Sequence, residues 1–204
     1  MRVSLIRHGQ TLDNARGVLQ GQLGRGLSEE GRAQVERLRG RLEGRTYAGL
    51  YTSDLERAAE SAQMLAPAVR LAPLKEPLLR EVDIGAWSGL TFCQVAERFP
   101  EEHARWSAGE DLPRGGGETY AAVGERMEIA MRNIAQAHPT GHVLAVSHGT
   151  AIRALSARIL GLRAHRFPSW PVMVNTAITV IELDGPLLKL ITWNDASHLE
   201  APLP

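Results

Sequence analysis

The sequence predicts an α/β protein: a three-layer sandwich in which a mainly parallel sheet lies between two layers of helices and closes with a C-terminal β-hairpin. Two observations lead to this fold class. Short apolar runs rich in β-branched residues alternate along the chain with longer segments whose apolar residues recur at helical spacing. The last two apolar runs, at 176–183 and 187–193, are separated by Asp184 and Gly185, a pair typical of a hairpin turn.

Local signals place the elements of the first part of the chain. Residues 3–7 form an apolar run with β-branched side chains, the pattern of a strand buried on both faces. Ser28 is a favoured N-cap ahead of apolar residues at near-helical spacing. In order, we expect a strand at 3–7, a polar glycine-rich loop at 9–26, a helix from Ser28 to Gly44, a strand at 48–52, a helix at 54–65 and a weaker strand at 69–73.

Capping signals organise the second part of the chain. Thr91 and Gln94 have the spacing of a capping box, and Gly161 is placed to end a helix. In order, we expect an irregular stretch at 73–89, a helix from Thr91 to near Pro100, a loop at 108–117, a long amphipathic helix opened by Glu118 and Thr119, a strand at 142–147, a helix at 151–160 and the hairpin. We expect residues 1–204 to form a single domain with a lid-like insertion at about 83–118, whose arginines show no spacing that assigns them a role.

The composition excludes several classes of protein. Lys plus Arg and Asp plus Glu both number 23, so no overall charge would hold the chain on nucleic acid or on an anionic membrane. Cys93 is the only cysteine, which excludes a disulfide framework and a thiolate metal cluster within the chain. The sequence opens directly on the first strand, and no apolar run approaches the length of about 18 residues typical of a membrane span. We therefore expect a cytoplasmic protein with no nucleic-acid or membrane partner.

Ionisable residues follow the predicted parallel strands. The carboxyl ends of such strands meet at one edge of the sheet, where loops and helix N-termini converge. The residues found after the successive strands are Arg7 and His8, Ser53 and Arg57, Arg80 and Glu81, and Ser147 and His148. Two imidazoles, at least two guanidiniums and a carboxylate at one edge predict an anion site with acid–base groups beside it.

Five short motifs follow one another in order between residue 3 and about residue 154. They are Arg7-His8-Gly9-Gln10-Thr11 with Asn14, Ser53-Asp54-Leu55-Glu56-Arg57-Ala58, Leu79-Arg80-Glu81-Val82-Asp83-Ile84-Gly85, Gly116-Gly117-Glu118-Thr119 and Val146-Ser147-His148-Gly149. Arg-His-Gly alone is a weak motif, but five motifs in order are specific. Together they resemble the histidine phosphatase superfamily, also called phosphoglycerate mutase-like. The resemblance implies that fold, and a metal-independent phosphatase that forms a covalent phosphohistidine.

The chemistry of phosphate monoesters agrees with the roles that the resemblance implies. Arg7 and Arg57 would bind the dianion with bidentate donors, and His8 would attack phosphorus while neutral. His148 would donate to the phosphoryl oxygens from the opposite side, and would be cationic if the bound phosphate raised its pKa. Glu81 would protonate the leaving oxygen and later accept a proton from water.

Other expectations rest on the resemblance alone. It adds Asn14, Gln20, Gly21 and the backbone of Gly149, at a helix start, to the phosphate cradle. It implies no metal ligand and no cofactor. The expected partner is a small phosphorylated metabolite, and the oligomeric state is left open, with a homodimer as one option.

The sequence is also compatible with two enzymes other than a phosphatase. The first is a cofactor-dependent phosphoglycerate mutase, although the best-known mutases resemble longer chains with more basic residues around the entrance. The second is a serine esterase, because residues 145–149 come close to the Gly-x-Ser-x-Gly pattern around Ser147, and Asp195 and His198 follow in the order of a catalytic triad. The esterase would leave the Arg7-His8-Gly9 motif without a task.

Overall fold

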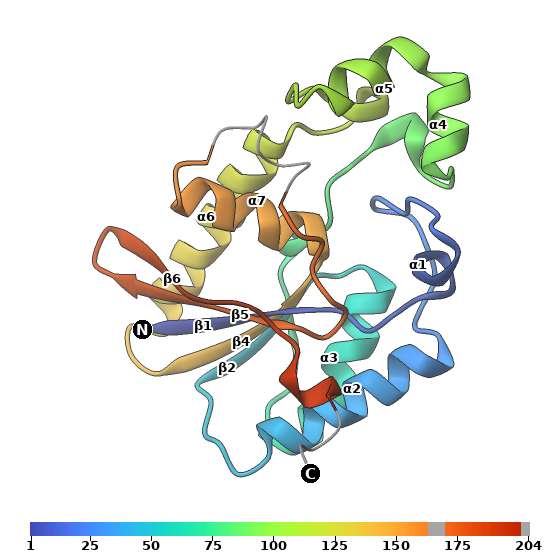
Figure 1. Cartoon of the computed structure of the whole chain (residues 1–204). Helices are drawn as coiled ribbons and strands as arrows, with labels where there is room; N and C mark the ends of the chain where they lie inside the picture. The colour runs from blue at the N-terminus through green and yellow to red at the C-terminus, as the bar shows by residue number, and fades with distance from the viewer. Residues whose placement is uncertain (163–169, 201–204) are drawn as a thin grey trace.

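One six-stranded sheet runs through the middle of the computed structural model, which describes residues 1–162 and 170–200 (Figure 1). The strands are β1 (Arg2–Arg7), β2 (Gly49–Thr52), β3 (Leu74–Lys75), β4 (His142–Ser147), β5 (Ile178–Asp184) and β6 (Leu187–Asp195). Their order across the sheet is β3-β2-β4-β1-β5-β6. The pairs β1–β4, β2–β4 and β2–β3 are parallel, whereas β5 runs antiparallel to β1 and to β6. The mainly parallel sheet and the C-terminal hairpin predicted from the sequence are confirmed.

The strand register brings the predicted polar residues to one edge. Arg7 pairs with Ser147 across β1 and β4, and Thr52 pairs with Val146 across β2 and β4. The residues that follow these three strands, His8, Ser53 and His148, therefore leave the sheet at the same level.

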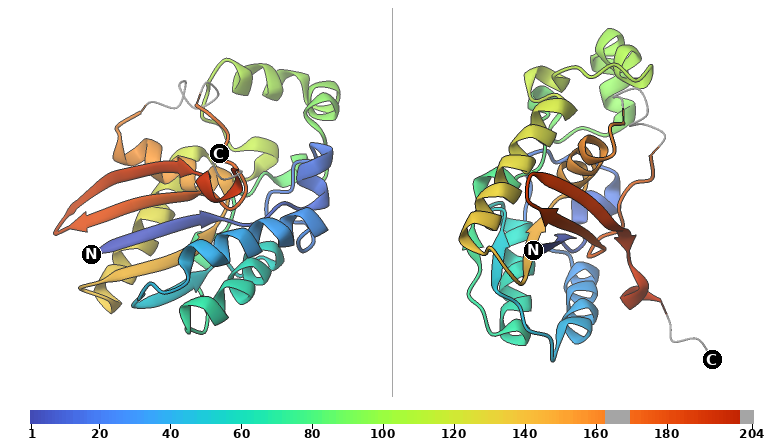
Figure 2. Two further views of the ribbon diagram at one scale, coloured as in Figure 1. Left: turned by 60° about the horizontal axis from the view of Figure 1, so that its bottom comes forward. Right: turned by 90° about the vertical axis from the view of Figure 1, so that its left-hand side faces the viewer.

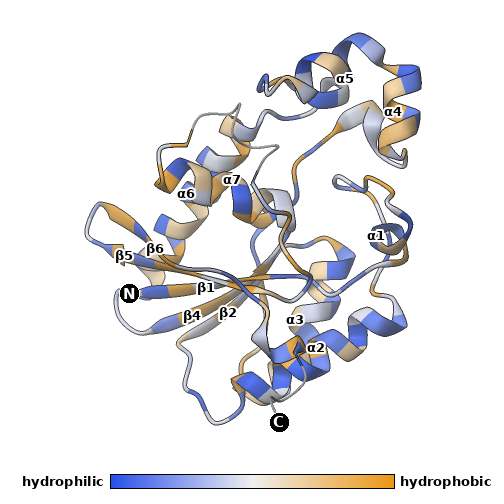
Figure 3. Ribbon diagram, viewed as in Figure 1, coloured by the Kyte–Doolittle hydropathy of each residue, from blue (hydrophilic) through white to orange (hydrophobic). Residues whose placement is uncertain are grey.

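Helices cover both faces of the sheet, which makes the three layers (Figures 1 and 2). The helices α2 (Glu29–Leu42) and α3 (Glu56–Val69) lie on one face, and α6 (Tyr120–Ala137) and α7 (Gly149–Ile159) lie on the other. Alternate residues of each central strand serve the two layers: Leu5 joins the core under α6 and α7, whereas Ile6 joins the core under α2 and α3. The outer helix α2 is mostly hydrophilic, while hydrophobic stretches lie in the sheet (Figure 3).

The remaining elements gather beyond the carboxyl edge of β1 or link the layers. They are α1 (Leu12–Arg16), α4 (Phe92–Arg98), α5 (Pro100–Ser107) and the short 3₁₀ turns η1 (Pro77–Leu79), η2 (Gly85–Trp87), η3 (Arg114–Gly116) and η5 (Ser197–Leu199). The helices α4 and α5, with η2 and η3, make up the stretch 83–118 and project past α1 and α7 (Figure 1). The single domain and the lid-like role of 83–118 stay predictions. No helix within residues 1–162 and 170–200 has both the length and the apolar character needed to cross a membrane.

Three predictions of local structure were wrong, each for a physical reason. Residues 69–73 are not a strand, because Val69 is buried on the last turn of α3 and Arg70 ends that helix in the left-handed conformation. The helix α1 was missed inside the polar loop, where Thr11 and Asn14 form a capping box with Asn in place of the usual Glu or Gln. The helix α5 was missed because Pro100, which ends the preceding pattern, also serves as the first residue of a new helix.

The loop that carries His8 packs directly on the start of α2, and this contact can be tested with a glycine pair. A Cβ added at Gly31 would lie 2.0 Å from the carbonyl oxygen of Gln10, whereas one added at Gly40 of the same helix would meet nothing within 4 Å. We expect Gly31→Ala to lower the free energy of unfolding by about 1–3 kcal/mol through overpacking. Gly40→Ala should raise it by up to about 1 kcal/mol through helix propensity. Urea unfolding of the two variants measures both, and equal effects would contradict the close approach.

Candidate active site

A pocket of about 160 Å³ lies at the carboxyl edge of the sheet. Apart from Thr150, its polar side chains are Arg7, His8, Asn14, Gln20, Arg57, Glu81 and Arg114, and Gly21 also lines it. The pocket therefore brings together most of the residues predicted from the sequence. His148 lies directly beside it, with its ring centroid 5.1 Å from that of His8.

The ring of His8 is held in one tautomer. Its Nδ1 lies 2.7 Å from the carbonyl oxygen of Gly9, which can only accept, so Nδ1 carries the proton. The other nitrogen, Nε2, is then an acceptor and receives a hydrogen bond of 3.2 Å from Nε of Arg57. An unprotonated Nε2 in the pocket is what a nucleophilic imidazole requires.

Burial keeps both imidazoles uncharged. It lowers the pKa of His8 well below its ordinary value of 6.5, and the charges of Arg57 and Arg7 lower it further. The pKa of His148 is lowered well below the same value, again first by burial and then by Arg57 and His8. Both rings are therefore neutral at pH 7. A cationic His148 would need the negative charge of a bound phosphate.

Of the two predicted guanidiniums, that of Arg57 is buried and that of Arg7 is partly buried, and both are held by backbone carbonyls. Arg57 donates to the carbonyls of Leu23 and Gly21, at 2.7 Å each, in addition to His8. Arg7 donates through Nη1 to the carbonyl of Met173, while its Nε is buried without a hydrogen-bond partner. Burial lowers the pKa of Arg7 to about 10, which leaves it charged at neutral pH. Rigid cations with an unused buried donor form a receptor for an anion.

The carboxylate of Glu81 caps the N-terminus of α7. Its Oε1 accepts hydrogen bonds from the amides of Val82 and Ala151, at 2.9 and 3.0 Å, and Oε2 accepts from the amide of Thr150 at 3.1 Å. These donors orient the carboxylate at the pocket wall, on the same helix start that carries Gly149.

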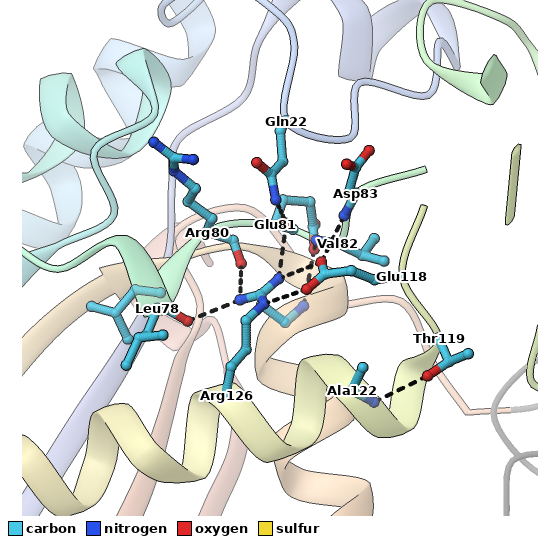
Figure 4. Close-up of polar contacts among 12 residues, drawn as sticks. Gln22, Leu78, Arg80, Glu81, Val82, Asp83, Glu118, Thr119, Ala122 and Arg126 are labelled. Carbon is cyan, nitrogen blue, oxygen red and sulfur yellow. Dashed lines mark hydrogen bonds and ion pairs between the residues drawn. The ribbon is translucent and has the colours of Figure 1, made fainter. Parts of the chain in front are cut away.

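A second arginine network holds the backbone on which Glu81 sits (Figure 4). Arg126, on α6, donates to the carbonyls of Leu78, Arg80 and Glu81 at 2.7–3.0 Å. It also forms a two-pronged ion pair with Glu118, whose Oε2 accepts from the amide of Asp83 at 2.9 Å. One side chain thereby positions the acid-bearing segment from outside the pocket.

Of the residues expected in the phosphate cradle, Asn14, Gln20 and Gly21 line the pocket, and Gly149 lies against Arg7. Asn14 lines the pocket and also caps α1, accepting from the amide of Thr11 at 3.2 Å. Gln20 donates to the hydroxyl of Thr11 at 2.9 Å, and its Oε1 is buried without a hydrogen-bond partner. Gly149 begins α7 against Arg7, where an added Cβ would lie 3.3 Å from Nε of Arg7. Their roles in binding stay predictions.

Several residues around the site were not predicted. Arg114 lines the pocket, and Asn175 donates to the carbonyl of His8 at 3.0 Å. The hydroxyl of Ser53 lies 2.8 Å from Nε2 of His148. The place of Ser53 at this edge, directly after β2, was predicted from the sequence, but its contact with His148 was not. Nothing in the sequence marks Asn175, which reaches His8 only through the fold.

The esterase interpretation is wrong on geometry. The hydroxyl of Ser147 is buried and donates to the carbonyl of Leu79 at 2.8 Å. His198 is hydrogen-bonded through Nε2 to the hydroxyl of Thr176, at 2.9 Å, and Asp195 pairs with Arg41. The three residues therefore form no triad. His198 instead anchors the chain end to Thr176, a residue in the left-handed conformation whose amide donates to the carbonyl of Arg7.

Two neutral imidazoles and two guanidiniums held by backbone carbonyls around a small pocket, with a carboxyl group at its wall, define a phosphoryl-transfer enzyme of the histidine type. Among the described residues, no group of three or more His, Cys, Asp or Glu side chains could hold a metal ion. The chain belongs to the histidine phosphatase superfamily (branch 1), whose family model matches residues 3–196. The family and fold predicted from the sequence, and the phosphatase class, are confirmed.

Comparisons with individual proteins agree. The chain is 34% identical over 204 residues to a metal-independent phosphoserine phosphatase of Arabidopsis thaliana, covering 98% of this chain and 83% of that protein. Its structure is similar to Bacillus stearothermophilus YhfR, with a TM-score of 0.91, 31% identity and coverage of 98% and 99% of the two chains. It is also similar to a mycobacterial glucosyl-3-phosphoglycerate phosphatase solved with VO3, with a TM-score of 0.86, 30% identity and coverage of 95% and 99%.

The network of Arg126 predicts a leaving-group effect. Without Arg126 the segment that carries Glu81 loses three carbonyl contacts, so we expect Arg126→Met to lower kcat/KM for an alkyl phosphate by about 10–100-fold. The loss on nitrophenyl phosphate, whose leaving group needs less protonation, should be clearly smaller. Arg132→Met, an exposed arginine of the same helix paired with Glu128, is the matched control. Equal losses on both substrates would show that Arg126 does not act through Glu81.

The buried neutral imidazoles predict how stability depends on pH. Below pH 6.5 the unfolded chain binds protons at His8 and His148 that the folded chain cannot bind, because folding lowers both pKa values. The free energy of unfolding should therefore fall as the pH drops below 6.5, by about 1.4 kcal/mol per pH unit for each imidazole. We expect His148→Asn to remove one such contribution from the slope between about pH 6 and pH 5, measured by urea unfolding in phosphate-free buffer. An unchanged slope would contradict the shift.

Proposed function

We propose that this enzyme hydrolyses phosphate monoesters of small metabolites in two steps through a phosphohistidine on His8, without a metal ion. The observation that carries the proposal is the fixed tautomer of His8, whose unprotonated Nε2 lies in the pocket beside Arg57. A histidine that acted only as a general base would not need an unprotonated nitrogen directed at a phosphate between two arginines. A histidine that attacks phosphorus needs this arrangement.

In the first step Nε2 of His8 attacks phosphorus and the bond from phosphorus to the ester oxygen breaks. Arg7 and Arg57 balance the charge of the phosphoryl oxygens. His148 has a buried Nδ1 without a hydrogen-bond partner, which makes this atom available to a phosphoryl oxygen. Glu81 enters this step as the carboxylic acid and gives its proton to the leaving oxygen, which departs as an alcohol.

In the second step water attacks the phosphohistidine. Glu81, now a carboxylate, accepts a proton from this water, the N–P bond breaks, and phosphate leaves with His8 restored. Glu81 can serve both steps because the amides at the start of α7 hold it in one place. Asn14, Gln20, Gly21 and Gly149 would complete the cradle for the phosphate.

The size of the pocket supports a small substrate. At about 160 Å³ it is below the range of about 300–1,000 Å³ that is usual for drug-sized ligands. The relatives named as phosphoserine and glucosyl-3-phosphoglycerate phosphatases support a phosphorylated metabolite as the substrate class. We further propose a cytoplasmic enzyme, in line with a single exposed cysteine, Cys93.

The decisive test is replacement of the nucleophile. We expect His8→Ala to lower kcat on nitrophenyl phosphate by at least about 10⁴-fold. The wild-type enzyme, quenched during turnover, should carry an acid-labile, alkali-stable phosphoryl group that the variant lacks. His138→Gln, a histidine at the far end of α6, serves as the control. Substantial activity of His8→Ala would refute the mechanism.

The same protein tests the other expectations. Activity should survive EDTA, and a loss on chelation would contradict metal independence. Production of 2-phosphoglycerate from 3-phosphoglycerate in the presence of a bisphosphoglycerate cofactor, faster than release of phosphate, would show the mutase alternative instead.

A further inference from the structure

Arg114 is a buried cation in the pocket that the mechanism above does not use. Only 7% of its surface is exposed, yet it lines the same pocket as His8 and Arg57. Its guanidinium lies over the ring of Tyr120, 4.4 Å from the centroid. Its Nη2 is buried and has no hydrogen-bond partner. A buried guanidinium nitrogen without an acceptor is costly unless a ligand supplies one.

The backbone around Arg114 is built to place it there. A Cβ at Gly115 would lie 2.4 Å from the carbonyl oxygen of Ile84, and one at Gly117 would lie 2.2 Å from that of Asp83. Both glycines therefore let the loop press against the segment that follows Glu81. The amide of Gly115 also donates to Glu102 of α5. The position of Arg114 is thus set by backbone packing on both sides and not by a flexible loop.

In the part of the chain that the structure describes, no carboxylate forms an ion pair with Arg114, although Glu118 lies near enough for the charge of Arg114 to help lower its pKa. Glu81 is the one acidic residue among those that line the pocket, and its oxygens accept amide hydrogens of α7 and of Val82. Glu118 is occupied by Arg126. A phosphate bound by Arg7 and Arg57 would be matched by those two cations. The third guanidinium then faces a part of the substrate beyond the phosphoryl group.

We propose that Arg114 binds a second anionic group of the substrate, a carboxylate, and so selects phosphate monoesters of small hydroxy acids or amino acids. This inference rests on the proposed phosphatase function and adds the residue that sets its specificity. A single planar guanidinium matches one carboxylate in a two-pronged contact, whereas a second phosphoryl group would bring a further dianion against one cation. The small pocket leaves room for only a short carbon chain between the two anions.

The test uses substrates that differ by one carboxylate. O-phosphoserine and O-phosphoethanolamine share the phosphate, the amine and the type of leaving group. We expect the wild type to prefer phosphoserine, and Arg114→Gln to lower kcat/KM for it by about 10–100-fold, mainly through KM, as for loss of a charged hydrogen bond. Phosphoethanolamine and nitrophenyl phosphate should change by no more than about threefold. Arg114→Lys, which keeps the charge and loses the planar fork, should fall between the two.

Controls separate recognition from folding. Arg105→Gln removes an exposed arginine of α5, paired with Glu110, and should leave the substrate preference unchanged. Competitive inhibition by inorganic phosphate should be the same in the wild type and in Arg114→Gln, because the phosphate subsite is intact. Equal losses of Arg114→Gln on both members of the pair would overturn the proposal. A selective loss on propanediol bisphosphate over its monophosphate, with the carboxylate pair unaffected, would show that the second anion is a phosphoryl group and would also overturn it.

Binding measurements test this inference separately from the proposed function. On a His8→Ala background, titration calorimetry measures binding of phosphoserine and phosphoethanolamine without turnover. Addition of Arg114→Gln should weaken binding of phosphoserine alone, by the same fold-change. If the wild type hydrolyses none of these esters, the proposed function fails, and this binding comparison still decides whether Arg114 reads a carboxylate.

Discussion

The structure depends on one hydrogen bond, from Nδ1 of His8 to the carbonyl oxygen of Gly9. It decides which ring nitrogen is free, and burial together with Arg57 keeps that nitrogen unprotonated. The backbone that sets the ring in place directly follows β1, a strand paired on both sides, by β4 and by β5. The position of His8 is therefore set by a strand with neighbours on both sides, as expected for a group that must be aligned before its substrate arrives.

Much of this arrangement follows from local sequence and one topological rule. Arg7 ends strand β1, while His8, Ser53 and His148 each directly follow a strand, and parallel pairing alone brings such positions together. Sequence could not place Arg114 or Asn175, because their contacts depend on how distant segments close over the sheet. Dependence on tertiary packing also explains why helix α5 was missed. A proline is compatible both with the end of one helix and with the start of the next, and only the packing of the folded chain decides between them.

The proposed acid and the proposed nucleophile are held by different layers of the sandwich. His8 is fixed by the sheet and by Arg57 of α3, whereas Glu81 is fixed by the start of α7 and, through the backbone, by Arg126 of α6. The distance between the two groups is thus set by how the two helical layers sit on the sheet. Packing in either core then affects catalysis without any contact with the substrate.

The central strand β1 is synthesised before both of the strands that pair with it, β4 and β5. Its residues pair with β4, beginning at His142, and with β5, beginning at Ile178. The position of His8 at the edge of the sheet therefore cannot be fixed until β4 and β5 have been synthesised. Such long-range pairing slows folding, and it leaves an apolar strand without neighbours until most of the polypeptide has emerged. The sheet around the pocket can be complete only after β5 has been synthesised, so the apolar side chains of β1 stay open to wrong partners for most of the time that synthesis takes.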